Sequence, residues 1–163
     1  MTDVVLEEVD QEDIHTPVAY ETAVEIEIRA PRERVWKALT EEVGAWWSHT
    51  YRDDIVGVYL EPWPGGRFYE KFDEDGNGGL YATVTYAEYP SLIRYQGPMG
   101  MPGSQLTTGR FELIEQSAET TLMKFTGWVM GDIPDELMEE RRRGGSEIYS
   151  SLVKYLEEGV KVR

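Results

Sequence analysis

Residues 22 to 40 read TAVEIEIRAPRERVWKALT, and two successive periodicities in this stretch decide the fold. From Thr22 to Arg29, apolar and charged residues alternate, which is typical of a strand with one buried face. From Pro31 to Thr40, the apolar residues recur at helical spacing, and proline suits the first turn of a helix. The stretch therefore predicts a strand followed directly by a short helix.

The segments that follow predict a second short helix and then an antiparallel sheet. Residues 42–48 form the helical segment and end near the pair Trp46-Trp47. Six later segments are rich in β-branched and aromatic residues or alternate in polarity: 54–60, 67–72, 80–86, 92–96, 106–115 and 120–129. Their short connections favour an antiparallel meander, because parallel neighbours need long crossovers.

The end of the chain predicts one amphipathic helix. Asp132 is a candidate N-cap, and Pro134 lies where a first turn would begin. The apolar residues of one helical face, which we expect to face the sheet, are Ile148, Leu152 and Leu156. The pair Gly144-Gly145 either interrupts this helix or allows it to approach the sheet closely.

Together these elements predict an α+β fold of the helix-grip type for residues 21–163. In such a fold, a curved antiparallel sheet of six or seven strands wraps around a long C-terminal helix, and two short helices follow the first strand. Residues 1–20 contain six acidic residues and no lysine or arginine. We expect them to form a flexible acidic tail that is not needed for folding.

Composition excludes several classes of function. With 31 acidic and 16 basic residues, the net charge is −15, which disfavours nucleic acid as a partner. The absence of cysteine and the presence of only two histidines argue against a metal site. The sequence contains no phosphate-binding loop and no dinucleotide fingerprint, so we expect no cofactor. Without a signal sequence or an apolar run long enough to span a bilayer, we expect a cytoplasmic protein with no membrane insertion.

Several motifs in a fixed order resemble the SRPBCC superfamily. The segment from Arg29 to Thr40 resembles the opening "A-P-x-x-x-V-W-x-A-L-T" of that superfamily. Four further motifs resemble the branch related to the C-terminal domain of the activator of Hsp90 ATPase: Trp46-Trp47, Gly65-Gly66-Arg67-Phe68, Ala82-Thr83-Val84 followed by residues 89–93, and Gly144 to Leu156. Ala82 and Ser146 stand where the branch usually has glycine and tryptophan, so the ligand space near them is expected to differ.

The resemblance implies a START-like or Bet v 1-like pocket between the sheet and the long helix. The residues expected to line it are Trp47, Phe68, Glu70, Phe72, Val84, Tyr95, Ile148 and Leu152. We expect the protein to bind a small, largely apolar ligand there. One alternative is a cyclase or dehydratase that uses a pocket glutamate or tyrosine as general acid or base. Another is a protein-interaction module; co-chaperone function is not expected, because the separate N-terminal domain of the eukaryotic co-chaperone is missing. The sequence leaves open whether the protein forms a homodimer.

Glu70 is the most informative polar candidate. It shares one strand face with Phe68 and Phe72, so it should point inward if they do. A buried carboxylate must be paired, neutralised or functional. Two alternatives stay open: that this face points outward, or that an arginine pairs with Glu70, with candidates Arg67, Arg94 and Arg110.

Three other features have a plainer interpretation. Phe111 and Phe125 are expected to pack in the core. His49 could act as a base near a pocket mouth but is interpreted as a surface histidine, since no triad surrounds it. The run Arg141-Arg142-Arg143 could bind an anion but is interpreted as a solvated face.

Overall fold

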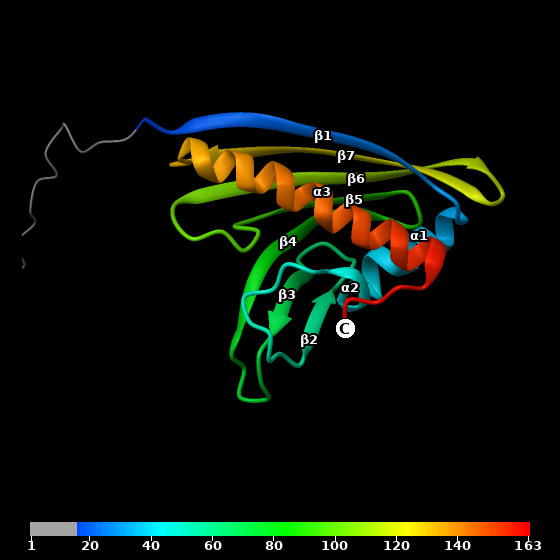
Figure 1. Ribbon diagram of the computed structural model, residues 1–163, viewed down its shortest axis with the longest axis horizontal. Coiled ribbons are helices and arrows are strands. Elements are labelled where there is room, and N and C mark those ends of the chain that lie inside the picture. Colours follow the sequence, from blue (N-terminus) through cyan, green and yellow to red (C-terminus); the bar gives the residue numbers. More distant parts are fainter. Residues whose placement is uncertain (1–15) are drawn as a thin grey trace, which may run out of the picture.

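Seven antiparallel strands form one curved sheet in the computed structural model, which describes residues 16–163 (Figure 1). The strands are β1 Val18–Ile28, β2 Gly57–Leu60, β3 Arg67–Lys71, β4 Gly78–Glu88, β5 Leu92–Gly97, β6 Gln105–Ser117 and β7 Thr120–Gly131. Across the sheet they lie in the order β1-β7-β6-β5-β4-β3-β2. β2 to β7 are therefore a meander, as the short connections predicted, and β1 pairs with β7.

β1 begins earlier than the sequence pattern indicated. Val18 pairs with Gly131 and Tyr20 pairs with Val129, so residues 18–20 belong to the sheet and not to a tail. Pairing with the long strand β7 provides hydrogen-bond partners for the backbone there. The side chains of residues 18 and 19 are both exposed, so their polarity gives no alternation. The boundary expected at residue 21 is thus shifted, and the remainder of the expected tail, residues 1–15, lies outside the described residues.

Two short helices follow β1, as predicted. α1 is Arg32–Thr40 and α2 is Val43–Trp46. Pro31 has extended backbone angles and lies at the N-cap position, one residue before the first turn. The indole N–H of Trp46 donates to the carbonyl of Ala38 at 2.7 Å and joins the two helices.

The final helix, α3 Asp135–Glu158, is continuous through Gly144-Gly145. The expected cap at Asp132 was wrong, because Pro134 holds the N-cap position and the N–H of Asp132 still bonds to the carbonyl of Ser104 in the preceding loop. The helix ends at Gly159, whose φ of 70° is a left-handed conformation that glycine adopts without strain.

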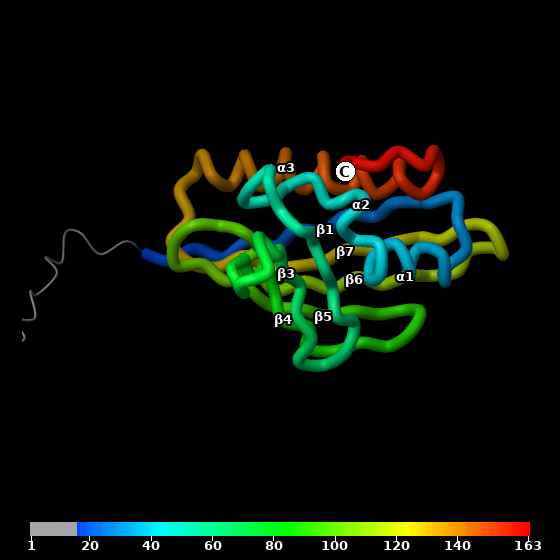
Figure 2. Tube along the Cα trace, turned by 90° about the horizontal axis from the view of Figure 1, so that it is seen from below, coloured from blue at the N-terminus to red at the C-terminus, as the bar shows by residue number. Residues whose placement is uncertain are grey.

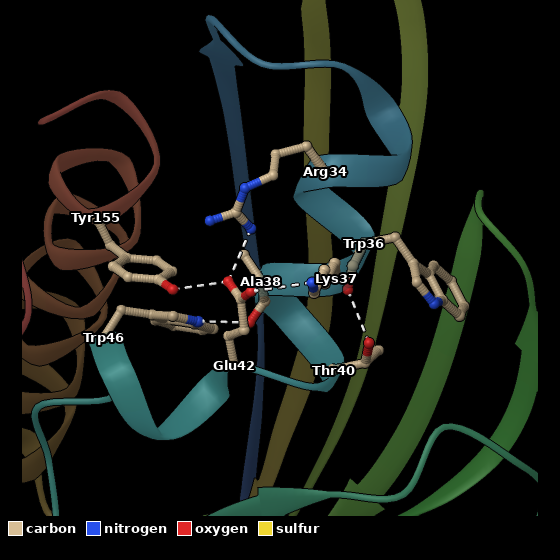
Figure 3. A network of polar contacts seen from close by, with 8 residues as sticks. All are labelled: Arg34, Trp36, Lys37, Ala38, Thr40, Glu42, Trp46 and Tyr155. Atoms are coloured by element: carbon tan, nitrogen blue, oxygen red, sulfur yellow. Dashed lines mark hydrogen bonds and ion pairs between the residues drawn. The ribbon is translucent and has the colours of Figure 1, made fainter. Parts of the chain in front are cut away.

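The C-terminal half of α3 is firmly attached to the rest of the fold. Leu152 is fully buried in the core. Glu157 accepts 2.9 Å bonds from both the backbone N–H and the guanidinium of Arg29. The hydroxyl of Tyr155 donates to Glu42 at 2.7 Å, and Arg34 donates to the same carboxylate at 2.8 Å (Figure 3). These contacts join α3 to β1, to α1 and to the turn before α2.

The N-terminal half of α3 is attached much less closely. In α3, Leu152 is the only buried residue, and Ile148 and Tyr149 pack against the core while partly buried. The turns from Asp135 to Glu147 contribute no residue to this core. Figure 2 shows α3 as a separate layer beside the sheet, with α1 and α2 near its C-terminal end. The arrangement confirms the α+β helix-grip fold.

Candidate functional site

A cavity of about 1610 Å³ lies between the concave face of the sheet and α3. Residues of all seven strands, of the three helices and of the loops after α2 and β5 border it. Five of the residues expected at the pocket border this cavity: Trp47, Phe68, Val84, Tyr95 and Ile148. Their contact with a ligand stays a prediction.

Aromatic rings form the central wall of the cavity. Phe111 on β6 and Phe125 on β7 are paired across the two strands, with ring centroids 5.1 Å apart. Tyr149 on α3 lies 5.7 Å from Phe125 and 6.4 Å from Phe111, so the helix and the sheet meet through these rings. Both phenylalanines pack in the core, as expected, because Phe125 is buried and Phe111 lies against the core cluster. The sequence did not indicate that they also border the cavity. Strand alternation was visible in the sequence, but it does not say which face borders a cavity.

Two glycines shape the wall of the cavity, one under the ring of Tyr95 and one in α3. A Cβ on Gly109 would be 2.2 Å from the ring carbon Cζ of Tyr95, so only glycine lets this ring lie against β6. Gly145 occurs in α3 one turn from both Arg141 and Tyr149, and a Cβ there would meet no atom within 4 Å. Gly145 therefore leaves an open gap in the helix face that borders the cavity, whereas the sequence suggested close approach to the sheet or a helix break.

Many polar and charged side chains border the cavity, and three of them lie near the aromatic wall. Arg141 donates to the side chains of Gln105 at 3.0 Å and Thr107 at 2.9 Å, both on β6. The hydroxyl groups of Tyr95 and Tyr149 are the other two. Burial raises the pKa of both phenols well above the ordinary value, and for Tyr95 the nearby Arg141 cation partly opposes the rise in pKa. Both phenols therefore stay protonated near neutral pH and can donate hydrogen bonds.

Glu70 is fully buried, but it does not border the cavity. Its carboxylate accepts from the backbone N–H groups of Tyr51 at 2.9 Å and Arg52 at 3.3 Å, and from the hydroxyl of Tyr81. Burial, followed by the hydrogen bond to Glu70, raises the pKa of Tyr81. The carboxylate therefore holds the loop after α2 against β3 and β4.

The arginines proposed as partners of Glu70 bind elsewhere. Arg67 pairs with Glu61 at 2.6 Å, Arg110 pairs with Glu112 at 3.0 Å, and Arg94 lies over the ring of Tyr86. Alternation correctly placed Glu70 on the buried face with Phe68. The partners could not be identified from the sequence because they are backbone groups of a distant loop.

Two further residues expected at the pocket lie outside it. Phe72 follows the end of β3 and packs against the ring of Tyr51 and the guanidinium of Arg52. The strand ends at Lys71, so the alternation that was extended to Phe72 does not apply there. Leu152 is buried in the core and does not border the cavity.

His49 lies at the edge of the cavity, on the loop after α2. Its Nε2 is 3.4 Å from the carboxylate of Glu147 on α3, and its Nδ1 is 3.1 Å from the hydroxyl of Ser48. The side chain is 43% exposed, in agreement with a surface histidine. This contact connects the loop to the first half of α3.

Metal-binding clusters of histidine, cysteine, aspartate and glutamate are absent from residues 16–163. Over the same residues, no helix is both long enough and apolar enough to cross a bilayer.

Comparisons with known proteins identify relatives in fold and family. The family model described as Activator of Hsp90 ATPase homolog 1-like protein matches residues 29–157. No curated protein sequence matches the chain. A solved structure from Rhizobium leguminosarum has a TM-score of 0.61 at 20% identity, covering 88% of this chain and 99% of that one.

Two other solved structures have the same fold. Ara h 8.0201 gives a TM-score of 0.61 at 15% identity, covering 85% of this chain and 98% of that one. DynU16, a protein in the dynemicin biosynthetic locus, gives 0.63 at 20% identity, covering 88% of this chain and 49% of that one. At such low identities, the likeness is one of fold.

Proposed function

The chain belongs to the family of Activator of Hsp90 ATPase homolog 1-like proteins, as its motif order predicted, and we propose that it binds a small, largely apolar ligand between the sheet and α3. The observation that carries this proposal is the cavity of about 1610 Å³ with its aromatic wall. Ligand sites in proteins are typically hollows of roughly 300 to 1,000 Å³ with apolar walls and a few placed polar groups. The cavity has room for such a ligand and water.

The geometry favours binding over catalysis by Glu70. A general acid or base must come within hydrogen-bond reach of the reacting group. Glu70 does not border the cavity and is held by Tyr51, Arg52 and Tyr81. Glu70 is therefore not placed to act as the general acid or base of a cyclase or dehydratase.

Gly145 offers a direct test, because side chains added there enter the open cavity. The fluorophore N-phenyl-1-naphthylamine is neutral and apolar, so it serves as a probe. We expect Gly145→Phe to weaken its binding by about tenfold or more, since the ring would occupy ligand space, which corresponds to about 1.4 kcal/mol. Fluorescence titration of the purified protein measures the effect.

Gly145→Ala is the matched control. It adds one methyl group and should raise the stability by about 1 kcal/mol, because alanine favours a helix more than glycine does. Its affinity for the probe should stay within about twofold of wild type, a difference of less than 1 kcal/mol. If the phenylalanine variant binds the probe as tightly as the alanine variant, the probe lies elsewhere and the proposed site is wrong.

A further inference from the structure

Arg141 is a cation at the cavity with only neutral partners. Its two hydrogen bonds go to the side-chain oxygens of Gln105 and Thr107, and Thr107 is 6% exposed. Within residues 16–163, no carboxylate lies within ion-pair distance of Arg141, although the chain has 31 acidic residues. The next residue, Arg142, shows the contrast, since it pairs with Glu139 at 2.8 Å.

The two bonds also fix the direction of the guanidinium. They extend from α3 across to β6 and hold the planar group at the border of the cavity. A guanidinium has more N–H donors than these two bonds use, and its planar shape suits a carboxylate or a phosphate. Donors therefore remain for a ligand.

Two tyrosine hydroxyl groups complete the polar set. Tyr95 is 8% exposed, and among the described residues neither its hydroxyl nor that of Tyr149 makes a hydrogen bond to another residue. Both residues border the open cavity, where a ligand can accept hydrogen bonds from their hydroxyl groups. Two unpartnered phenols and an unpaired cation at one cavity fit a ligand that accepts hydrogen bonds and carries negative charge.

We propose that the ligand carries an anionic group, a carboxylate or a comparable oxyanion, which Arg141 binds with help from Tyr95 and Tyr149, while its apolar body lies along Phe111 and Phe125. This inference rests on the proposed function and specifies the ligand class. A chain with a net charge of −15 repels anions in general, so a local cation is needed to admit one. Next to the aromatic wall, such a charge-assisted contact discriminates between ligands by their charge.

Two probes with equal chain length isolate the effect of the ligand's charge on binding. Dodecanoate and dodecan-1-ol differ in the head group, and both can be titrated by displacement of N-phenyl-1-naphthylamine at pH 8. We expect wild type to bind dodecanoate about tenfold or more tightly than the alcohol, because a charge-assisted hydrogen bond contributes at least this factor. Arg141→Gln should weaken dodecanoate binding by about tenfold and leave dodecan-1-ol within about twofold.

Arg94→Gln is the matched control. Arg94 lies on the opposite face of β5, over the ring of Tyr86, and does not border the cavity. This variant removes the same charge and should keep the preference for dodecanoate. Arg141→Lys keeps the charge and should retain a reduced preference, so it serves as a second test if Arg141→Gln folds poorly.

The outcomes separate the two proposals. If wild type binds the alcohol as tightly as the acid, or if Arg141→Gln keeps the full preference for the acid, the anionic ligand class is wrong and the apolar site stands. If neither probe displaces the fluorophore, or if the fluorophore itself does not bind, the proposed function fails and the inference fails with it.

Discussion

At the scale of single residues, Glu70 shows how a buried charge can be structural. The carboxylate has no exposed surface, yet it receives two backbone N–H bonds and one hydroxyl bond. These bonds fix the loop that carries Tyr51 and Arg52, which follows Trp47 at the cavity. Glu70 thus acts on the site through the position of this loop.

Glu70→Gln should therefore lower the stability. An amide nitrogen cannot accept a hydrogen bond, so at least one donor that now bonds to the carboxylate would lose its partner. We expect a loss of about 1 to 3 kcal/mol in the free energy of unfolding, measured with urea. Glu88→Gln is the control: Glu88 is exposed and accepts only from the hydroxyl of Tyr86, and its replacement should cost about 0.5 kcal/mol or less. Equal losses in the two variants would contradict the structural role.

At the scale of elements, the sequence predicted each helix and strand but not how α3 is attached. Alternation and helical spacing are local signals, and they indicated the seven strands and three helices of residues 16–163. The attachment depends on contacts between distant residues, such as Tyr155 with Glu42 and Arg29 with Glu157. No local pattern indicates which half of the helix packs into the core. The cavity beside α3, and Arg141 at its border, were missed for the same reason.

The contact between α3 and α1 should depend on pH. Burial alone would raise the pKa of Glu42, but hydrogen bonds from Tyr155 and Arg34, together with the charges of Arg34 and Lys37, outweigh burial and lower it. The ionised form is therefore favoured by folding. Its contribution is fully present above the ordinary glutamate pKa of 4.5 and is lost as the pH falls through the lower pKa of the folded state.

Glu42→Gln measures this contribution. At pH 7, we expect the variant to be less stable than wild type by about 0.5 to 1 kcal/mol, a modest value because the network is partly exposed to solvent. At a pH below 4.5, the difference from wild type should be smaller than at pH 7, because the wild-type carboxylate becomes protonated as the pH falls through its lowered pKa. Urea unfolding at both pH values tests this. Glu41→Gln changes an exposed neighbour and should have little effect at either pH, whereas a difference for Glu42→Gln that is unchanged with pH would contradict the network.

At the scale of the whole molecule, the fold combines a closed end with an open one. Around α1, α2 and the end of α3, a dense core that includes Trp36, Trp46 and Leu152 provides stability. Beside this core, the curved sheet leaves the cavity of about 1610 Å³, whose border follows α3 from Met138 to Glu158. Motif order predicted the family and the architecture, because these depend on many residues at once. The ligand class depends on a few side chains, chiefly Arg141, Tyr95 and Tyr149. These residues are distant in the sequence, and only the three-dimensional structure shows that they lie at one cavity.

The most direct test of the ligand site is a titration of ¹⁵N-labelled protein with dodecanoate, followed by the backbone amide signals. The account predicts dose-dependent shifts for residues that border the cavity, with Phe111, Phe125 and Gly145 as reporters. The amide of Gly76, which lies in the loop between β3 and β4 and does not border the cavity, should not move. An unchanged spectrum, or shifts confined to residues outside the cavity, would contradict a ligand site between the sheet and α3.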